Sequence, residues 1–173
     1  MRGPGRPRPR YPVACEPPPR QRGAYATEFA LVFLLFFAVV YGLITYGLIF
    51  TAQQSLNLAA QDGARAALRW QQGGEPLLAR AAAARDVALD RARWVQAMAG
   101  AGALQVAVCD AGGLLSGNGA CSGQALPDRA LEVVLRYPYA QAPLVPTFSR
   151  LLVPGALASR SIVRLFDAGP EGI

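Results

Sequence analysis

The longest apolar pattern in the chain is a run of uncharged residues over 29–50. Twenty-two residues with a rise of about 1.5 Å each make a helix of roughly 33 Å, which matches a bilayer hydrocarbon core of about 30 Å. The run is longer than the apolar region of a cleaved secretory signal, about 7–15 residues, and no small-residue cleavage site follows it. The alternative is a buried soluble helix, but a helix apolar on all sides needs a large protein around it. The pattern therefore predicts a transmembrane span over 29–50.

Beyond this span, small apolar residues recur every three or four positions, so the same helix is expected to continue. We predict one long helix over 24–70, broken by the two glycines within 71–74. A second helix is predicted over 75–100, because Pro76 suits a first helical position and Gly100 an end. The stripe on the first helix comprises Ser55, Leu56, Ala59, Ala60, Gly63, Ala64, Ala67 and Leu68. The apolar face of the second comprises Leu77, Ala81, Ala84, Val87 or Ala88, Arg91, Val95 and Met98.

After residue 103 the hydrophobic period changes from that of a helix to alternation, which predicts strands. We expect strands over 104–109 and 157–166 from this alternation and a strand over 131–139 from its β-branched and aromatic residues, with a Gly-rich loop over 110–123. Three strands make a small antiparallel sheet over 104–167, which needs a helix or a partner subunit to cover it. The predicted fold class is α+β. The inward face of the last strand is expected to comprise Leu157, Ser159, Ser161, Val163 and Leu165.

Positive charge is concentrated at the N-terminus. Residues 1–23 contain six Arg, one Glu and seven of the fourteen Pro, so we predict a disordered basic leader. The remaining residues carry a net charge of only +1, against +6 for the whole chain, so nucleic-acid binding is not expected. Because basic flanks stay on the cytoplasmic side, the leader is predicted to be cytoplasmic and residues after about 51 extracytoplasmic.

Composition excludes much catalytic chemistry. The chain has no His, and all seventeen basic residues are Arg, so imidazole bases, His metal sites, Schiff bases and Ser-Lys dyads are excluded. We expect no enzyme, no cofactor and no metal site. A hydrolase that uses a pair of carboxylates is an alternative, but Asp86 and Asp90, one helical turn apart, are more typical of a solvated helix face.

Three cysteines are present, at 15, 109 and 121. Cys15 lies in the leader, on the predicted reducing side of the membrane. Cys109 and Cys121 lie at the ends of the Gly-rich loop, on the predicted outer side, where a disulfide would tie the loop down. The alternative is that they are two unrelated small apolar residues.

The segment from Gly23 to Glu28 directly precedes the apolar run. A carboxylate at the mouth of a membrane span is costly, and the simplest explanation is that Glu28 interacts with the helix dipole. The spacing suggests a second explanation. If the chain is cut between Gly23 and Ala24, the new α-amine and Glu28 lie about 6 Å apart along a helix axis. Between staggered neighbouring helices, the amine of one subunit would pair with the carboxylate of the next, which would set the register of an assembly.

The segment RGAYATEFALVFLLFFAVVYGLITYGLIF resembles the start of TadE-like proteins, the minor pseudopilins of the tight-adherence (Flp-type) pilus system. Gly23, Glu28 and Phe29 match the family pattern, in which a basic leader ends in Gly and Glu-aromatic opens an apolar helix. The C-terminal segment SRSIVRL, residues 159–165, also looks like the family's last strand. The resemblance covers about 22–70 and implies a pilin-like fold.

The resemblance implies that an inner-membrane prepilin peptidase cuts after Gly23 and that the mature chain joins or primes a pilus used in adhesion. Its implied partners are membrane lipid, the peptidase, other pilin or pseudopilin subunits and the pilus assembly platform. The alternative is a single-pass accessory protein of a secretion or pilus machine that is never cut. The state of residues 1–23 in the mature protein separates the two hypotheses.

Overall fold

A computed structural model of the chain describes residues 22–69, 76–100, 102–146 and 153–165. Most of the predicted leader and the predicted break at 71–74 lie outside the described residues. Contacts divide the chain into two compact units, Met1–Tyr41 and Gly42–Ile173, which are described separately below. Helix α1, Arg22–Ala67, runs through both, so the prediction of one long N-terminal helix is confirmed.

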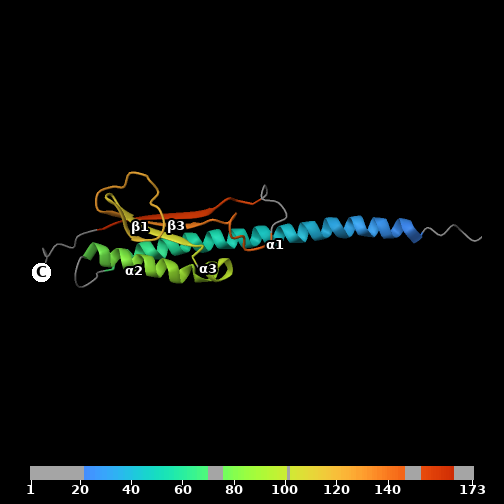
Figure 1. The fold of residues 1–173 in the computed structure, drawn as a ribbon, viewed down its shortest axis with the longest axis horizontal. Coiled ribbons are helices and arrows are strands. Elements are labelled where there is room, and N and C mark those ends of the chain that lie inside the picture. The colour runs from blue at the N-terminus through green and yellow to red at the C-terminus, as the bar shows by residue number, and fades with distance from the viewer. Residues whose placement is uncertain (1–21, 70–75, 101, 147–152, 166–173) are drawn as a thin grey trace, which may run out of the picture. The chain divides into compact units, whose positions relative to one another are not determined.

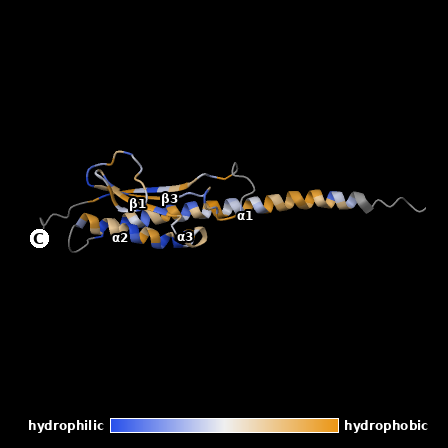
Figure 2. Ribbon diagram, viewed as in Figure 1, coloured by the Kyte–Doolittle hydropathy of each residue, from blue (hydrophilic) through white to orange (hydrophobic). Residues whose placement is uncertain are grey.

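The part of α1 within the first unit has an exposed apolar surface. Every described side chain from Tyr25 to Val39 is exposed, and the hydrophobic run is visible in Figure 2. Among the described residues, one helical stretch, Tyr25–Ala67, is long and apolar enough to cross a membrane. Only 6% of its most apolar part is buried, which argues against a core helix and is compatible with a single-pass membrane anchor.

The second unit is a two-layer α/β arrangement. A four-stranded antiparallel sheet has the order β2-β1-β3-β4, and helices lie against one of its faces (Figure 1). The α+β class is therefore confirmed. Besides α1, the elements are α2 (Pro76–Arg91), α3 (Arg93–Ala99), β1 (Gln105–Asp110), β2 (Gly113–Gly117), β3 (Ala130–Tyr137) and β4 (Leu157–Arg164).

The sheet has one strand more than the sequence analysis predicts. Strand β2 lies within the predicted Gly-rich loop and forms a hairpin with β1. Asp110 closes the turn, since its Oδ1 accepts hydrogen bonds from the amides of Gly112 at 2.8 Å and Gly113 at 3.0 Å. The strand was not predicted because its segment is rich in glycine, which is typical of a loop. It forms because Leu115 packs against the core and because β1 provides an edge for pairing.

The predicted second helix is interrupted. Ala92 leaves the helical conformation, with φ −94° and ψ 7°, and separates α2 from α3. Alanine is the strongest helix former, so the break comes from tertiary contacts. In α3, Val95 is buried and Trp94 Nε1 donates a hydrogen bond to Ser55 Oγ on α1 at 2.7 Å.

The predicted apolar face of the second helix is partly wrong. Arg91 and Met98 are exposed, whereas Arg80, which was not expected in the core, is buried. The rest of the predicted face is confirmed, because four alanines, three of them predicted, form the buried seam together with the predicted Val95. These alanines are Ala81, Ala84, Ala88 and Ala92.

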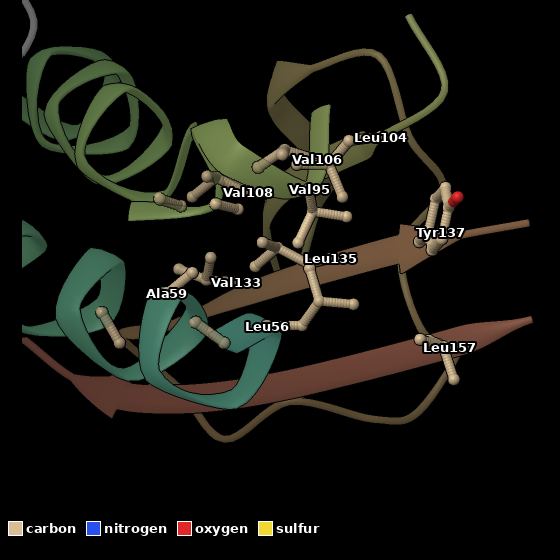
Figure 3. Packing of buried hydrophobic residues seen from close by; sticks show 14 of the residues in the cluster. Leu56, Ala59, Val95, Leu104, Val106, Val108, Val133, Leu135, Tyr137 and Leu157 are labelled. Atoms are coloured by element: carbon tan, nitrogen blue, oxygen red, sulfur yellow. The ribbon is translucent and has the colours of Figure 1, made fainter. Parts of the chain in front are cut away.

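The core lies between this seam, the small-residue stripe of α1 and the inner face of the sheet (Figure 3). The stripe is buried as predicted apart from Ser55, which is half-buried, and Leu68, which is exposed. Along β4, Leu157 and Ser159 of the predicted inward face are buried. Val163 and Leu165 are partly buried against the core, which agrees with the predicted face. Leu131, Val133 and Leu135 supply the inner face of β3.

The segment after β3 is held by two tyrosines. Tyr137 and Tyr139 are fully buried, and their rings meet edge to face with centroids 6.0 Å apart. The Tyr137 hydroxyl donates to the carbonyl oxygen of Ala142. Burial, followed by the neighbouring Tyr139 phenol, raises the pKa of the Tyr137 phenol, so this group remains a protonated donor up to strongly alkaline pH.

Gly63 allows α1 to approach α2 closely. A Cβ at this position would lie 2.8 Å from the Ala84 carbonyl oxygen and 3.1 Å from the Ala88 Cβ. Gly63→Ala gains about 1 kcal/mol of helix propensity but forces the helices apart, at about 1–3 kcal/mol, so we expect a net loss of about 1 kcal/mol in unfolding free energy. Thermal unfolding of the full chain in detergent, followed by circular dichroism, measures it.

Gly47→Ala is the matched control, because Gly47 lies on the same helix and a Cβ there meets nothing within 4 Å. We expect this variant to unfold at the wild-type temperature or slightly above it. Equal melting temperatures for the two variants would contradict the close packing of α1 on α2.

Candidate processing and assembly site

The predicted processing residues lie at the beginning of α1. The helix begins at Arg22, so Gly23 and Ala24 are in its first turn. Glu28 lies about 6 Å further along the axis and is exposed, as is Phe29. The structure thus places the four predicted residues on one continuous helix, with the peptide bond between Gly23 and Ala24 inside its first turn.

The electrostatics of this helix end favour a carboxylate. The N-terminus of a helix carries a partial positive charge, because its first amides have no partner within the helix. A cut after Gly23 would place a full ammonium charge on Ala24 at this same end, and the two positive charges would repel. The only carboxylate between residues 24 and 61 is that of Glu28, so it is the nearest group along α1 that could balance both.

A ridge of stacked aromatic rings begins next to Glu28. The ring centroids are 5.9 Å apart for Phe29 and Phe33, 6.5 Å for Phe33 and Phe37, and 6.4 Å for Phe37 and Tyr41. These residues are four positions apart and therefore share one side of the helix. Sequence analysis did not identify this ridge, although its spacing of four is visible in the sequence. A continuous aromatic surface is well suited to packing against lipid or a neighbouring helix.

The two cysteines of the second unit are joined. Cys109, at the end of β1, forms a disulfide with Cys121, in the loop that follows β2. Glu132 on β3 lies opposite Cys109 in the sheet and was not predicted as a functional residue. It is fully buried and forms an ion pair with Arg160 on β4. Nothing in the local sequence marks Glu132, because its burial depends on the loop that Cys121 holds.

The acids of the second helix lie on a solvated, charge-paired surface. Asp86 is paired with Arg85 at 3.3 Å and Asp90 with Arg93 at 3.7 Å, and all four side chains are partly or well exposed. Asp86 and Asp90 line a shallow depression between α1 and α2, where Asp62 is paired with Arg91 at 3.0 Å. Exposed ion pairs of this kind contribute little to folding stability. Each of these acids is paired with an arginine rather than placed beside a second carboxylate.

These features define a class of α+β protein with one long apolar N-terminal helix and a small antiparallel sheet. Within that class, residues 23–65, about a quarter of the chain, match the family model described as TadE-like protein. The match begins at Gly23, includes Glu28, and confirms the predicted resemblance over this segment. It associates the chain with the tight-adherence pilus proteins, a family that is structural rather than catalytic. No curated protein and no solved structure matches the chain.

Proposed function

We propose that this protein is a minor pilin-like subunit of a tight-adherence pilus system, processed by a prepilin peptidase after Gly23. The observation that carries the proposal is a single exposed carboxylate, Glu28, at the start of an uncharged apolar helix whose family match begins at the proposed cut. The protein is proposed to act by assembly with other pilin or pseudopilin subunits and the assembly platform, without an active site of its own.

The proposed location is the bacterial inner membrane, with a single span over 29–50. Charge supports this orientation, because residues 1–23 carry a net charge of +5 and the chain has no further charge between Glu28 and Asp62. The disulfide between Cys109 and Cys121 also supports an oxidising environment for the sheet, since disulfides persist outside the cytoplasm. The leader is therefore proposed to stay cytoplasmic until it is removed.

The alternative, an uncleaved accessory protein with a membrane anchor, is supported by one observation. Helix α1 already includes Gly23 and Ala24, and a peptide bond inside a helical turn must unwind before a peptidase can hold it in an extended form. The first turn is the part of a helix that unwinds most easily, because its amides lack intrahelical partners. The peptide bond is therefore accessible at a modest cost, and we favour the processed subunit.

The mass of the mature chain tests the proposal. The full chain is produced in a bacterium with an active prepilin peptidase, extracted from inner membranes and analysed by intact mass spectrometry. We expect a chain that begins at Ala24, and the full-length chain when the peptidase carries inactivated catalytic aspartates. Full-length protein in both strains would overturn the proposal and support the accessory hypothesis.

Gly23→Trp should reduce the processed fraction by about tenfold or more, because a peptidase pocket shaped for glycine excludes a large side chain. Gly47→Leu is the matched control, since it also places a large side chain at a glycine of α1 where a Cβ meets nothing within 4 Å. Normal processing of Gly23→Trp would mean that the cut lies elsewhere.

A further inference from the structure

The loop over 118–129, between β2 and β3, is attached to the face of the sheet that is opposite the helices. Val133 points toward Gly63 on α1, so its neighbour Glu132 points to the other face by the alternation of a strand. Figure 1 shows the loop on the side of the sheet away from α2. The start of the loop is held to β1 by hydrogen bonds of Asn118 and Gly119 with Val106. Beyond this start, the loop has one attachment on each of three strands: Cys121 to Cys109 on β1, the Ser122 amide to Glu132 Oε2 on β3 at 3.3 Å, and Gln124 Oε1 to Arg160 on β4.

The closed loop covers a buried charge. Glu132 has an exposed fraction of 0%, whereas the side chain of Arg160, its ion-pair partner, is 28% exposed. Removing a carboxylate from water is costly even when it is paired, and the cost disappears when water regains access. Burial of the Glu132 carboxylate therefore destabilises the closed conformation of the loop. A covalent bond beside Glu132 offsets this cost in free energy.

The disulfide lies where it can hold the loop closed. Cys109 and Glu132 are direct partners in the register of β1 and β3, so the bond is adjacent to the buried carboxylate. The hydrophobic core lies on the other face of the same strands, through Val106, Val108 and Val133. The strands can therefore stay paired and packed when the loop leaves the outer face.

We propose that the Cys109–Cys121 bond is a redox-controlled clip that keeps Glu132 buried. In the oxidised chain the loop is closed over the carboxylate. In the reduced chain the loop opens and Glu132 is solvated, while the four strands remain paired. The folded sheet thus has two states of its outer surface, selected by the oxidation state of two cysteines.

The chemistry is thiol–disulfide exchange. On closing, the thiols of Cys109 and Cys121 together lose two protons and two electrons to the disulfide of a thiol-oxidising protein, which is released as a dithiol. On opening, an external thiolate attacks the Sγ atom of Cys121, which is less buried than Cys109, and Cys109 leaves as a thiolate. A second external thiol then completes the reduction.

Hydrogen exchange of the full chain in detergent, with and without dithiothreitol, tests the clip. Reduction should increase exchange at the Ser122 amide by about tenfold or more, since its hydrogen bond to Glu132 is lost. Exchange within β1, β3 and β4 should change less than about twofold. The Cys15→Ser variant, which lacks the third thiol of the chain, should behave like the wild type, and the double variant Cys109→Ser, Cys121→Ser like the reduced chain.

The Glu132→Gln variant tests whether the buried charge drives opening of the loop, or whether loss of the disulfide alone loosens it. The variant has no charge to bury and keeps an oxygen that can accept from the Ser122 amide. After reduction, exchange at Ser122 should therefore stay within about threefold of the oxidised variant. A tenfold increase in the reduced Glu132→Gln chain would overturn the role of the charge.

Two further results would overturn the proposal. One is unchanged exchange at Ser122 after reduction of the wild type, and the other is an equal increase throughout the sheet, which would indicate global unfolding. None of these measurements depends on processing at Gly23 or on pilus assembly. The clip and the proposed function can therefore fail independently.

Discussion

Replacement of Gly117 by alanine should destabilise the second unit by about 4 kcal/mol, a large part of the roughly 5–15 kcal/mol that stabilises a typical domain. Gly117 ends β2 with φ at +122°, a conformation that side chains rarely adopt. A Cβ there would lie 2.0 Å from the carbonyl oxygen of Val106 on the neighbouring strand. The strain costs about 1–3 kcal/mol, and relief of the overlap about as much again.

Chemical unfolding of the full chain in detergent, followed by far-ultraviolet circular dichroism, measures this loss. Gly113→Ala is the matched control, because Gly113 begins the same strand with φ at +128° but a Cβ there meets nothing within 4 Å. The control carries the backbone strain without the overlap, so we expect a loss of about 1–3 kcal/mol. Losses of the same size in both variants would show that β2 does not approach Val106 closely.

The hairpin that contains Gly117 includes a strand, β2, that could not be predicted from the sequence. Strands β1 and β4 were predicted because their residues alternate with period two, and β3 because it is rich in β-branched and aromatic residues, and both signals are local. Strand β2 is short, is bounded by glycines, and depends on pairing with β1 and on contact between Leu115 and the core. Composition alone therefore predicts a loop, and only the tertiary partners make it a strand.

The long helix and its apolar run were predictable for the opposite reason. Hydrophobic length, the absence of charge over 29–61 and the spacing of the small-residue stripe as far as Ala67 can all be read from residues close together in the sequence. The break at Ala92 was not predictable, because alanine favours a helix and the interruption serves the contact between Trp94 and Ser55, 39 positions apart.

The two candidate sites differ in the same way, because one is a local sequence pattern and the other depends on tertiary structure. The processing and assembly residues, Gly23 and Glu28, lie five positions apart and form a pattern that the sequence alone displays. The clip needs three strands and a loop, so Glu132 and Arg160 are separated by 28 positions and look like ordinary surface charges. Such a pair is found only once the register of the sheet is known.

Loss of the Glu28 charge should reduce pilus assembly by about a hundredfold or more. In the proposed assembly, the α-ammonium group of Ala24 in one subunit donates to the Glu28 carboxylate of an adjacent subunit, within or near the membrane. Breaking a buried ion pair by removing one partner costs about 3–5 kcal/mol, and each 1.4 kcal/mol corresponds to a factor of ten. Both Glu28→Ala and Glu28→Gln should show this loss, because the charge rather than the shape of the side chain is required.

Insertion should be unaffected, since either change makes the start of the span less polar. The measurement is the number of surface pili in a deletion strain that expresses each variant, with membrane fractionation to quantify the inserted chain. Asp86→Ala is the control, because Asp86 is a well-exposed acid on α2, and it should restore pili as the wild type does. Glu28→Asp keeps the charge on a shorter side chain and should retain part of the function.

The pattern across these variants matters more than any single one. A helix-dipole role alone would make Glu28→Gln mild, because such interactions contribute only about 0.3–1 kcal/mol and assembly would fall less than tenfold. A register role requires the negative charge and also the free amine, so Glu28→Gln and an uncut Gly23→Trp chain should fail to the same extent. Normal pili with Glu28→Gln would show that the aromatic ridge from Phe29 to Tyr41 packs the subunits in register without a charge.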